Sequence, residues 1–255
     1  MLTVYPSYTR LFMWRNRLLY FGLSQQLNAH TYAAVALHIG LYEPFLIKIA
    51  NGNWQTCRCV LIPVGIKHAL NFGRGIHAKI FIERDSVDFL YCQRRFNYAT
   101  RQITLFYDES LIAQLKWIYE TNPSKVIIEQ YLDKILGCDG SLKMQLDKRV
   151  QRAIHLICDT PDNHFSYQYL AEINSLSPSR FLHLFKQHTN MSYRRFRAWR
   201  RLFLAVERLN SADNMTFAAV DAGFADAPHF SHSFKEAFGI NPAFVFRGID
   251  RFEVK

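Results

Sequence analysis

Apolar side chains recur with helical spacing near the end of the chain. Phe230, Phe234 and Ala237 follow one another at i, i+4 and i+7, which predicts a short helix with one apolar face. A shorter helical stretch comes before it and breaks at Gly223. The sequence therefore predicts two short helices joined by a tight turn, the pattern of a helix-turn-helix.

The same pattern occurs earlier, between Ser166 and Gln187, where Phe181 and Phe185 lie on the apolar face. Ser177 followed by Pro178 marks the start of the second helix, because a hydroxyl can cap free amide groups and proline suits the first helical position. The chain thus contains an internal repeat. Its matching positions are Phe181 and Phe230, His183 and His232, Phe185 and Phe234, and Lys186 and Lys235.

A single long helix is predicted between the repeats. Residues Ser192–Asn210 contain no Gly or Pro and carry Leu202, Val206 and Leu209 at helical spacing. The helix would be roughly 28 Å long at about 1.5 Å per residue, which is close to the ~34 Å between successive major-groove faces of B-DNA. A plain helical bundle used for oligomerisation is the competing interpretation of the apolar stripes.

Residues from Ser7 to about Tyr107 show alternation of period two instead. Short segments rich in β-branched residues are separated by turn residues such as Gly65 and Gly73. Regularly spaced short strands predict an all-β sandwich or barrel. The clearest candidate strands are Tyr32–Leu41, Phe45–Ala50, Thr56–Gly65 and Ile76–Glu83.

Two amphipathic segments, Ser110–Glu120 and Ser124–Leu136, follow the strands and predict an antiparallel helix pair. The pair could pack on its own barrel or expose a stripe to a second subunit, and the two readings are equally supported. Residues Gly137–Ser141 are predicted to be a short, flexible interdomain linker. The predicted domains are 1–140, with a helical segment at about 108–137, and 141–255.

The repeats resemble the AraC/XylS family of bacterial transcription regulators. The resemblance runs from about Asp147 to Arg247. It is carried by a Gly-Phe turn, a Phe-x-x-x-Phe-Lys helix and a Gly-x-x-Pro-x-x-x-x-Arg tail in Ala222–Arg247, and by Arg201, Leu202 and Ala205 of the long helix. The chain departs from the family at Ser175, where glycine is usual, and at His183 and His232, where arginine is common.

The resemblance implies an α+β protein. Its N-terminal part would be a cupin-like jelly-roll β domain with a helical dimerisation segment, and its C-terminal part an all-α domain with two helix-turn-helix motifs joined by a linker helix. It also implies a sequence-specific DNA-binding transcription regulator, an activator in many relatives, that works without enzyme activity. The segment Val60–Leu70 is similar to a Pro-x-x-x-x-His turn of cupins, with His30 in the place of an early inward-facing histidine.

The outer faces of the two second helices supply the candidate base readers. Histidine can donate a hydrogen bond to a base or phosphate, but it lacks the bidentate fork of arginine. The candidates are Ser179, Arg180, His183, Lys186 and Gln187 in the first repeat, and Pro228, His229, His232 and Lys235 in the second.

The long helix carries six arginines, and Glu207 is the only acidic residue that faces them. This excess of positive charge favours contact with phosphate over a merely solvated surface. We expect Arg194 and Arg197 to contact phosphate. Arg195 and Arg201 could instead brace the two motifs.

The net charge of the chain is a second indication that it binds a polyanion. The 255 residues have a formal net charge of +10. Residues 147–255 hold 15 Lys and Arg against 11 Asp and Glu, while residues 1–146 hold 16 against 10, so basicity alone does not locate the DNA site. The N-terminal excess could reflect an anionic effector or a nonspecific surface. Candidate effector contacts are Tyr32, His38, Trp54, Arg58, Lys67, His68 and Phe81.

Metal and redox chemistry have little support in the sequence. Cys57 and Cys59 would share one face of a strand, and no second pair at zinc spacing accompanies them. Among His30, His38, His68 and His77 the His-x-His pair of a metal-binding cupin is absent. We therefore predict no metal and no cofactor.

The five scattered cysteines and the absence of a long apolar run predict a reducing, cytoplasmic protein without membrane contact. Predicted partners are double-stranded DNA, a small-molecule effector, RNA polymerase if the protein is an activator, and a second copy of the chain. Two alternatives stay open: a metal-dependent cupin enzyme fused to a DNA-targeting module, and an architectural protein that binds DNA without sequence preference.

Overall fold

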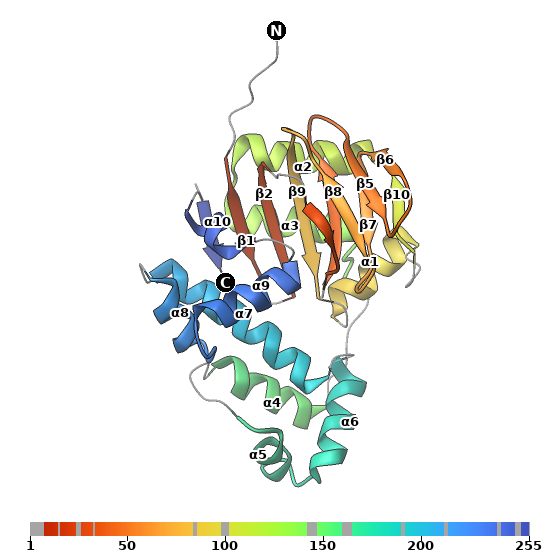
Figure 1. Ribbon diagram of the computed structural model, residues 1–255. Coiled ribbons are helices and arrows are strands. Elements are labelled where there is room, and N and C mark those ends of the chain that lie inside the picture. Colours follow the sequence, from red (N-terminus) through yellow and green to blue (C-terminus); the bar gives the residue numbers. More distant parts are fainter. Residues whose placement is uncertain are drawn as a thin grey trace.

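The computed structural model has a β-rich N-terminal part and a helical C-terminal part (Figure 1). The coarse α+β prediction is confirmed. Within the described residues, no helix is long and apolar enough to cross a membrane. The structure describes residues 8–14, 16–23, 27–32, 34–83, 86–97, 102–141, 147–159, 165–189, 192–211, 214–238, 241–247 and 251–254.

Seven strands form the larger sheet, in the order β10-β7-β4-β9-β2-β1-β11. Neighbours are antiparallel except for β1 and β11, which run parallel. The last strand of the chain thus joins the N-terminal sheet, although it lies among residues predicted for the DNA-binding domain. The strands are β1 (Arg10–Met13), β2 (Arg17–Leu23), β4 (Val35–Gly40), β7 (Cys59–Ile62), β9 (Ile76–Ile82), β10 (Thr104–Phe106) and β11 (Arg251–Val254).

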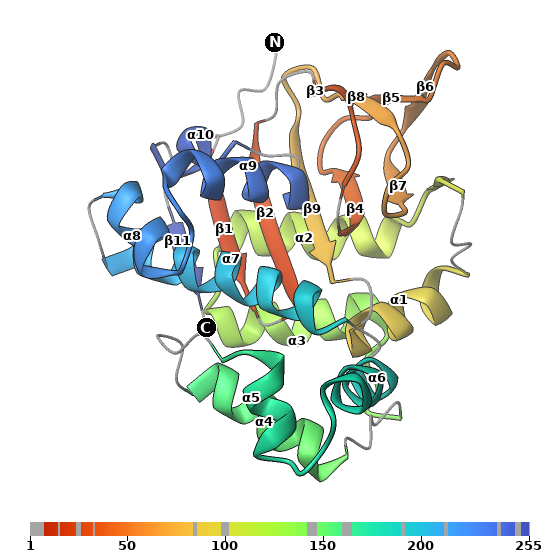
Figure 2. The ribbon, with the colours of Figure 1, turned by 60° about the horizontal axis from the view of Figure 1, so that its bottom comes forward.

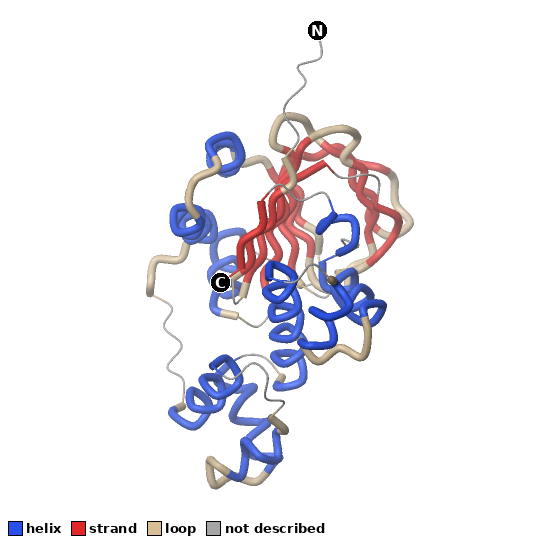
Figure 3. The backbone as a smooth tube through the Cα atoms, turned by 90° about the vertical axis from the view of Figure 1, so that its left-hand side faces the viewer, coloured by secondary structure: helices blue, strands red, loops and turns tan. Residues whose placement is uncertain are grey.

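Four strands form the smaller sheet, in the order β3-β8-β5-β6. Its residues Ile47 and Leu70 share one apolar cluster with Tyr20 and Phe81 of the larger sheet, so the two sheets enclose a common interior. We call the two facing sheets the barrel and this space the barrel interior. Figure 3 shows the strands curving around this space. The strands are β3 (Leu27–His30), β5 (Phe45–Ile49), β6 (Trp54–Cys57) and β8 (His68–Asn71).

The central strands are buried on both faces. In β2, Leu18 and Tyr20 point into the shared interior, while Leu19 and Phe21 belong to a second cluster beneath two helices. These helices, α2 (Glu109–Thr121) and α3 (Lys125–Leu136), cover the outer face of the larger sheet, as Figure 2 shows. Burial on both sides explains the nearly continuous apolar run of β2.

Both helices match their predicted segments. The Asp108 side chain accepts a hydrogen bond from Leu111 N at 3.0 Å and caps α2, and Asn122 ends it with φ 49°. Trp117 and Tyr131 stack across the pair with ring centroids 4.8 Å apart. The pair therefore packs on its own sheet, while a role in dimerisation stays a prediction.

Helix α1 was not predicted. Residues Val87–Phe96 form α1, within the region that was expected to contain only strands. The local signals are clear in retrospect: the Ser86 side chain accepts from Phe89 N at 3.1 Å, and Phe89 and Cys92 share a buried face. Asn97 ends the helix with φ 46°.

The expectation that Cys57 and Cys59 share one face of a strand is wrong. The predicted strand Thr56–Gly65 breaks at Arg58, so Cys57 ends β6 in the smaller sheet and Cys59 begins β7 in the larger one. The two thiols consequently lie in different apolar clusters. Burial raises the pKa of Cys57 to about 12 and that of Cys59 to about 11, which keeps both as unreactive thiols.

The C-terminal helices divide between two apolar clusters. Helices α4 to α6 pack together with Tyr193 at the start of α7, whereas α7 to α9 share the cluster of the barrel interior. Figure 1 shows α4, α5 and α6 below the rest of the molecule. The helices are α4 (Lys148–Asp159), α5 (Tyr167–Glu172), α6 (Pro178–Thr189), α7 (Tyr193–Ser211), α8 (Met215–Asp221), α9 (Ala227–Phe238) and α10 (Pro242–Arg247).

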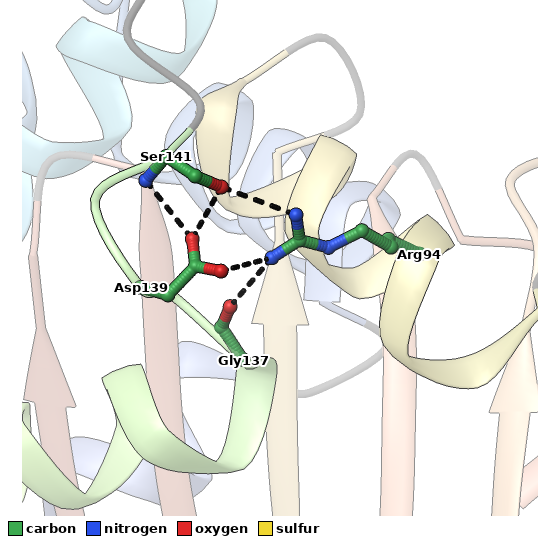
Figure 4. A network of polar contacts seen from close by, with 4 residues as sticks. All are labelled: Arg94, Gly137, Asp139 and Ser141. Carbon is green, nitrogen blue, oxygen red and sulfur yellow. Dashed lines mark hydrogen bonds and ion pairs between the residues drawn. The ribbon is translucent and has the colours of Figure 1, made fainter.

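The predicted linker is held by α1 over the residues that the structure describes (Figure 4). Arg94 donates to Asp139 Oδ2 at 2.7 Å and to Ser141 Oγ at 3.1 Å, and Ser141 N donates to Asp139 Oδ1 at 2.9 Å. Hydrogen bonds from Ser141 and Arg94 lower the pKa of Asp139. The segment Gly137–Ser141 therefore has a defined path beside the barrel.

Candidate functional site

The first helix pair, α5 and α6, is built as its sequence indicates. Arg180 N donates to the Ser177 hydroxyl at 3.2 Å, so Ser177 caps α6. Phe181 and Phe185 are fully buried and meet the Tyr193 ring edge-on, with centroids 5.9 and 5.6 Å away. The apolar stripe of α6 thus anchors this helix to the start of α7.

The second pair, α8 and α9, repeats this arrangement. The Asp226 carboxylate accepts from His229 N at 2.7 Å and caps α9, as Ser177 caps α6. Phe230 and Phe234 are fully buried, and their ring centroids lie 5.7 Å apart.

The two turns also share their backbone geometry. Ser175 and Gly223 adopt positive φ angles of 53° and 84°. The following residue closes each turn: Leu176 N donates to Ala171 O at 2.9 Å, and Phe224 N donates to the carbonyl of Ala219 at 3.0 Å. Both helices therefore end in a Schellman-type cap. Counted from the residue with positive φ to the start of the following helix, the second turn is one residue longer than the first.

The outer faces of α6 and α9 are exposed, as predicted. Every candidate base reader on these helices is exposed in the structure. The residues are Ser179, Arg180, His183, Lys186 and Gln187 on α6, and Pro228, His229, His232 and Lys235 on α9. Their contact with DNA stays a prediction.

The turn preceding α9 orients the His229 ring. Its Nδ1 lies 3.4 Å from Ala225 N, and its ring meets Phe224 edge-on at 5.3 Å. Because a backbone amide can only donate, Nδ1 acts as the acceptor, which assigns the proton of the neutral ring to Nε2. His229 therefore offers one donor, the chemistry that guanine O6 or N7 accepts.

The expectation that the six α7 arginines face only Glu207 is wrong. Arg200 donates to Cys158 O at 3.2 Å, Arg201 donates to Gly223 O at 3.3 Å, and Arg208 pairs with Asp221 at 3.0 Å. Arg201 thus braces the turn of the second pair, as one of the alternatives predicted. The two candidate phosphate contacts differ in exposure. Arg194 is exposed, whereas Arg197 is half-buried, with its guanidinium carbon 5.9 Å from the centroid of the Tyr193 ring.

Arg195 joins the two parts of the molecule. Its Nε lies 2.5 Å from Glu83 Oε1 at the end of β9, and Glu83 is 2% exposed. A cavity of about 240 Å³ adjoins this ion pair and is lined by residues of α7 and α9, including Trp199 and Glu236. Arg195 therefore contacts the barrel, while its bracing role between the repeats stays a prediction.

Four of the seven predicted effector contacts lie together in the barrel interior. The Tyr32 ring is 5.6 Å from His38, 4.7 Å from His68 and 5.3 Å from Phe81. His30, the early inward-facing histidine, lies 4.5 Å from His68. Tyr32, His38, His68 and Phe81 are buried, and His30 is half-buried.

The other three predicted effector contacts lie elsewhere. Trp54 is 39% exposed on β6, and Lys67 is exposed in the turn before β8. Arg58 donates to the backbone carbonyls of Tyr42 and Leu41 at 3.0 and 3.1 Å. The guanidinium of Arg58 is thus engaged by the loop after β4.

Two further residues face the interior: His77, considered above only as a possible metal ligand, and Lys79, which was not among the predicted effector contacts. His77 and Lys79 on β9 are each 1% exposed. The β9 sequence IHAKIFI alternates so that the lysine would normally face solvent, but β9 is buried on both sides. Within the described residues, no group of three His, Cys, Asp or Glu side chains could hold a metal ion.

Comparison with known proteins agrees with this geometry. Residues 170–248 match the model of a helix-turn-helix domain. The arabinose operon regulatory protein of Salmonella typhimurium is 37% identical over 121 residues, which are 46% of this chain and 43% of that protein. The transcriptional activator RhaS of Escherichia fergusonii is 36% identical over 104 residues, or 39% and 37% of the two chains.

The C-terminal part of the chain is thus similar to a helix-turn-helix domain and to these transcription regulators. The chain spans less than half the length of these curated relatives. In family terms, Ser175 holds the left-handed turn conformation that glycine usually supplies. His183 and His232 occupy exposed positions where family members commonly carry arginine.

A similarity of fold extends over most of the chain. A structure of ToxT from Vibrio cholerae covers 92% of this chain and 99% of ToxT, with a TM-score of 0.52 and 10% identity. A second ToxT structure, bound to (E)-4-(8-methylnaphthalen-1-yl)but-3-enoic acid, has a TM-score of 0.50 and 12% identity and covers 91% and 98%. A β-rich part followed by a helical part is thus an arrangement found in solved proteins.

Proposed function

We propose that this protein is a sequence-specific DNA-binding transcription regulator with two helix-turn-helix motifs. One observation carries the proposal: α5–α6 and α8–α9 have the same turn geometry, cap position and buried phenylalanine pair, and one 19-residue helix joins them. A helical bundle used only for oligomerisation would need none of these repeated features on exposed helices.

In this proposal, the outer faces of α6 and α9 read base edges, because side chains near the start of a recognition helix reach into the major groove. Arg180 offers a bidentate fork for guanine, while His183, His229 and His232 offer single donors. Arg194 and Arg197 of α7 would contact phosphate and set the register.

We propose that residues 1–140 form a cupin-like jelly-roll sensor with its helical segment, and that residues 141–255 form the DNA-binding domain. The change from strands to helices along the chain supports this division, although α7 to α9 share an apolar cluster with the sheets and β11 pairs with β1. The α2–α3 pair is the candidate surface for a homodimer. RNA polymerase is a further proposed partner if the protein activates transcription.

A small-molecule effector would act by favouring one arrangement of the two parts, which requires unequal affinity for the two states. The contacts that could differ between the states are the Glu83–Arg195 ion pair and the Phe81–Phe238 ring contact at 5.3 Å. ToxT, similar in fold, has been solved with a bound carboxylic acid, which makes organic acids reasonable first compounds to test.

A genome-wide map of sites bound by the full-length protein tests the proposal. We expect a small set of sites with a shared sequence, and binding to such a site at least about 10³-fold tighter than to random DNA at physiological salt. Similar affinity and a similar salt slope for both DNAs would instead identify an architectural binder. Stoichiometric metal in the purified protein would favour the cupin enzyme.

A further inference from the structure

The barrel interior contains a buried lysine, Lys79, whose electrostatics show no contribution from a carboxylate of the described residues. Lys79 lies opposite Tyr20 on β2 and opposite His38 on β4, so the three side chains share the inner face of the larger sheet. The Lys79 ammonium is 5.6 Å from the Tyr20 ring centroid and 5.2 Å from that of Phe72. Rings stabilise a buried cation only partly, because they supply no counter-ion.

Within the described residues, the charged or titratable groups that influence the histidines around this lysine are other histidines, Lys79 itself and, at His30, Lys235 of α9. His38 on β4 and His77 on β9 are buried, and Lys79 lowers the pKa of both. His68 on β8 and His30 on β3 also feel the charge of Lys79. None of these pKa values is influenced by a carboxylate.

Several polar atoms of the same cluster have no hydrogen-bond partner within the described residues. They are both ring nitrogens of His38, Nε2 of His68 and of His30, and the Tyr32 hydroxyl. The His77 ring lies close enough to the Gly75 backbone to be influenced by it, so at most one of its nitrogens needs a further partner. Buried polar groups are normally paired, so a concentration of unpaired ones indicates an absent partner. Burial also lowers the pKa of Lys79 to about 7, so this amine is largely neutral at pH 8 and would regain its charge beside a bound acid.

We propose that the barrel interior binds a small organic carboxylate with an apolar body, whose acid group pairs with Lys79 and hydrogen-bonds to His38 and His77. This site rests on the proposed role of the barrel as the effector domain and names its ligand class. Phe72, which stacks on His77 at 4.0 Å, and Tyr32 would contact the apolar body.

The cluster also has a link to the helices. His30 lies at its edge on β3, where it is half-buried and its ring is 4.7 Å from that of Tyr32. Phe81 follows Lys79 on the same face of β9 and meets Phe238 of α9 edge-on. A ligand that shifts the inner face of β9 would therefore move a contact of the second helix-turn-helix.

The test uses octanoate and its neutral analogue 1-octanol at millimolar concentration with the full-length protein. Octanoate should raise the melting temperature by at least about 2 °C, as expected when a ligand binds only the folded state. Lys79→Met should abolish this rise, because the substitution keeps the volume and removes the charge. Lys67→Met, which changes an exposed lysine, should retain it.

A second measurement needs no variant. Calorimetry of octanoate binding at pH 8, in buffers of different ionisation enthalpy, should detect uptake of close to one proton per acid, since Lys79 regains its charge on binding. Absence of any octanoate effect, an equal effect of 1-octanol, an unchanged response in Lys79→Met or binding without proton uptake would each overturn the proposal. DNA is absent from both measurements, so their failure leaves the proposed DNA-binding function standing.

Discussion

At the scale of residues, one buried lysine shapes the electrostatics of the barrel. Burial lowers the pKa of Lys79 to about 7 from 10.5. Below pH 7 Lys79 is charged in both the folded and the unfolded chain. Folding then carries the full cost of removing its ammonium group from water, about 1.4 kcal/mol per unit of pKa shift. Between pH 7 and 10 the unfolded chain binds more protons, and this cost disappears as pH rises.

Lys79→Met should therefore raise the free energy of unfolding by a few kcal/mol at pH 7 in the absence of ligand. The gain over wild type should shrink progressively toward pH 10. His38 and His77 do not titrate in this window, because their pKa values lie well below 6.5. Urea unfolding at several pH values measures the difference, and a gain independent of pH would contradict the charge assignment.

The turns give a second prediction at this scale. Gly223→Ser places a side chain at φ 84° and should lower the free energy of unfolding by about 1 kcal/mol, the typical cost of a left-handed non-glycine residue. Ser175→Gly at φ 53° should have the opposite sign. Thermal unfolding of both variants provides the comparison, and a loss of stability in each would show that strain does not control these turns.

Sequence reasoning succeeded for residues whose surroundings are local. Ser177 as a helix cap and the exposed face of α6 depend on neighbours within a few positions, so both could be predicted. Lys79 could not, because its burial depends on strands far away in the sequence. Arg58 and Lys67 were chosen as effector contacts for their charge alone, and the structure turns both away from the interior.

At the scale of elements, helical spacing predicted α2, α3, α6, α7 and α9 well. Alternation of period two was less reliable. It did not predict α1, whose capping serine lies in a region that otherwise contains strands. It also predicted one strand where β6 and β7 are separated by the bend at Arg58. A strand that crosses from one sheet to the other keeps its apolar alternation, so pattern alone cannot locate the break.

Helix α7 supplies a prediction about phosphate contact. Arg194→Ala should weaken binding to specific and random DNA equally and reduce the salt slope by about one unit. Arg208→Ala is the matched control on the same helix, because Arg208 is engaged with Asp221. Binding assays over a range of salt concentrations distinguish them. A loss confined to one DNA sequence would mean that Arg194 reads a base.

At the scale of the whole molecule, the second helix-turn-helix and the barrel share one apolar cluster, whereas α4 to α6 form another. Strand β11 adds a further connection through its parallel pairing with β1. The two helix pairs are thus held differently: α8–α9 is packed on the barrel, and α5–α6 is not. This asymmetry suggests that contacts with the barrel control how both units meet DNA together.

Glu83→Gln tests this idea by weakening the ion pair with Arg195. If the pair holds an arrangement that binds DNA poorly, affinity for a specific site should rise by about fivefold or more. The salt slope should stay unchanged, since no phosphate contact is gained. Asp221→Asn, which removes an ion pair within the C-terminal part, is the control. Equal effects of the two substitutions in binding assays would contradict a role for the barrel contact.

The central claim is that α6 and α9 read two separate stretches of one DNA site. Selection of preferred sequences from a random DNA pool tests it most directly, with wild type, Arg180→Ala, His232→Ala and the barrel-surface control Arg74→Ala. We predict that the first two variants each lose preference at one end of the site, about one helical turn apart, and that Arg74→Ala selects the wild-type sequence. Unchanged preferences in both helix variants would contradict the account.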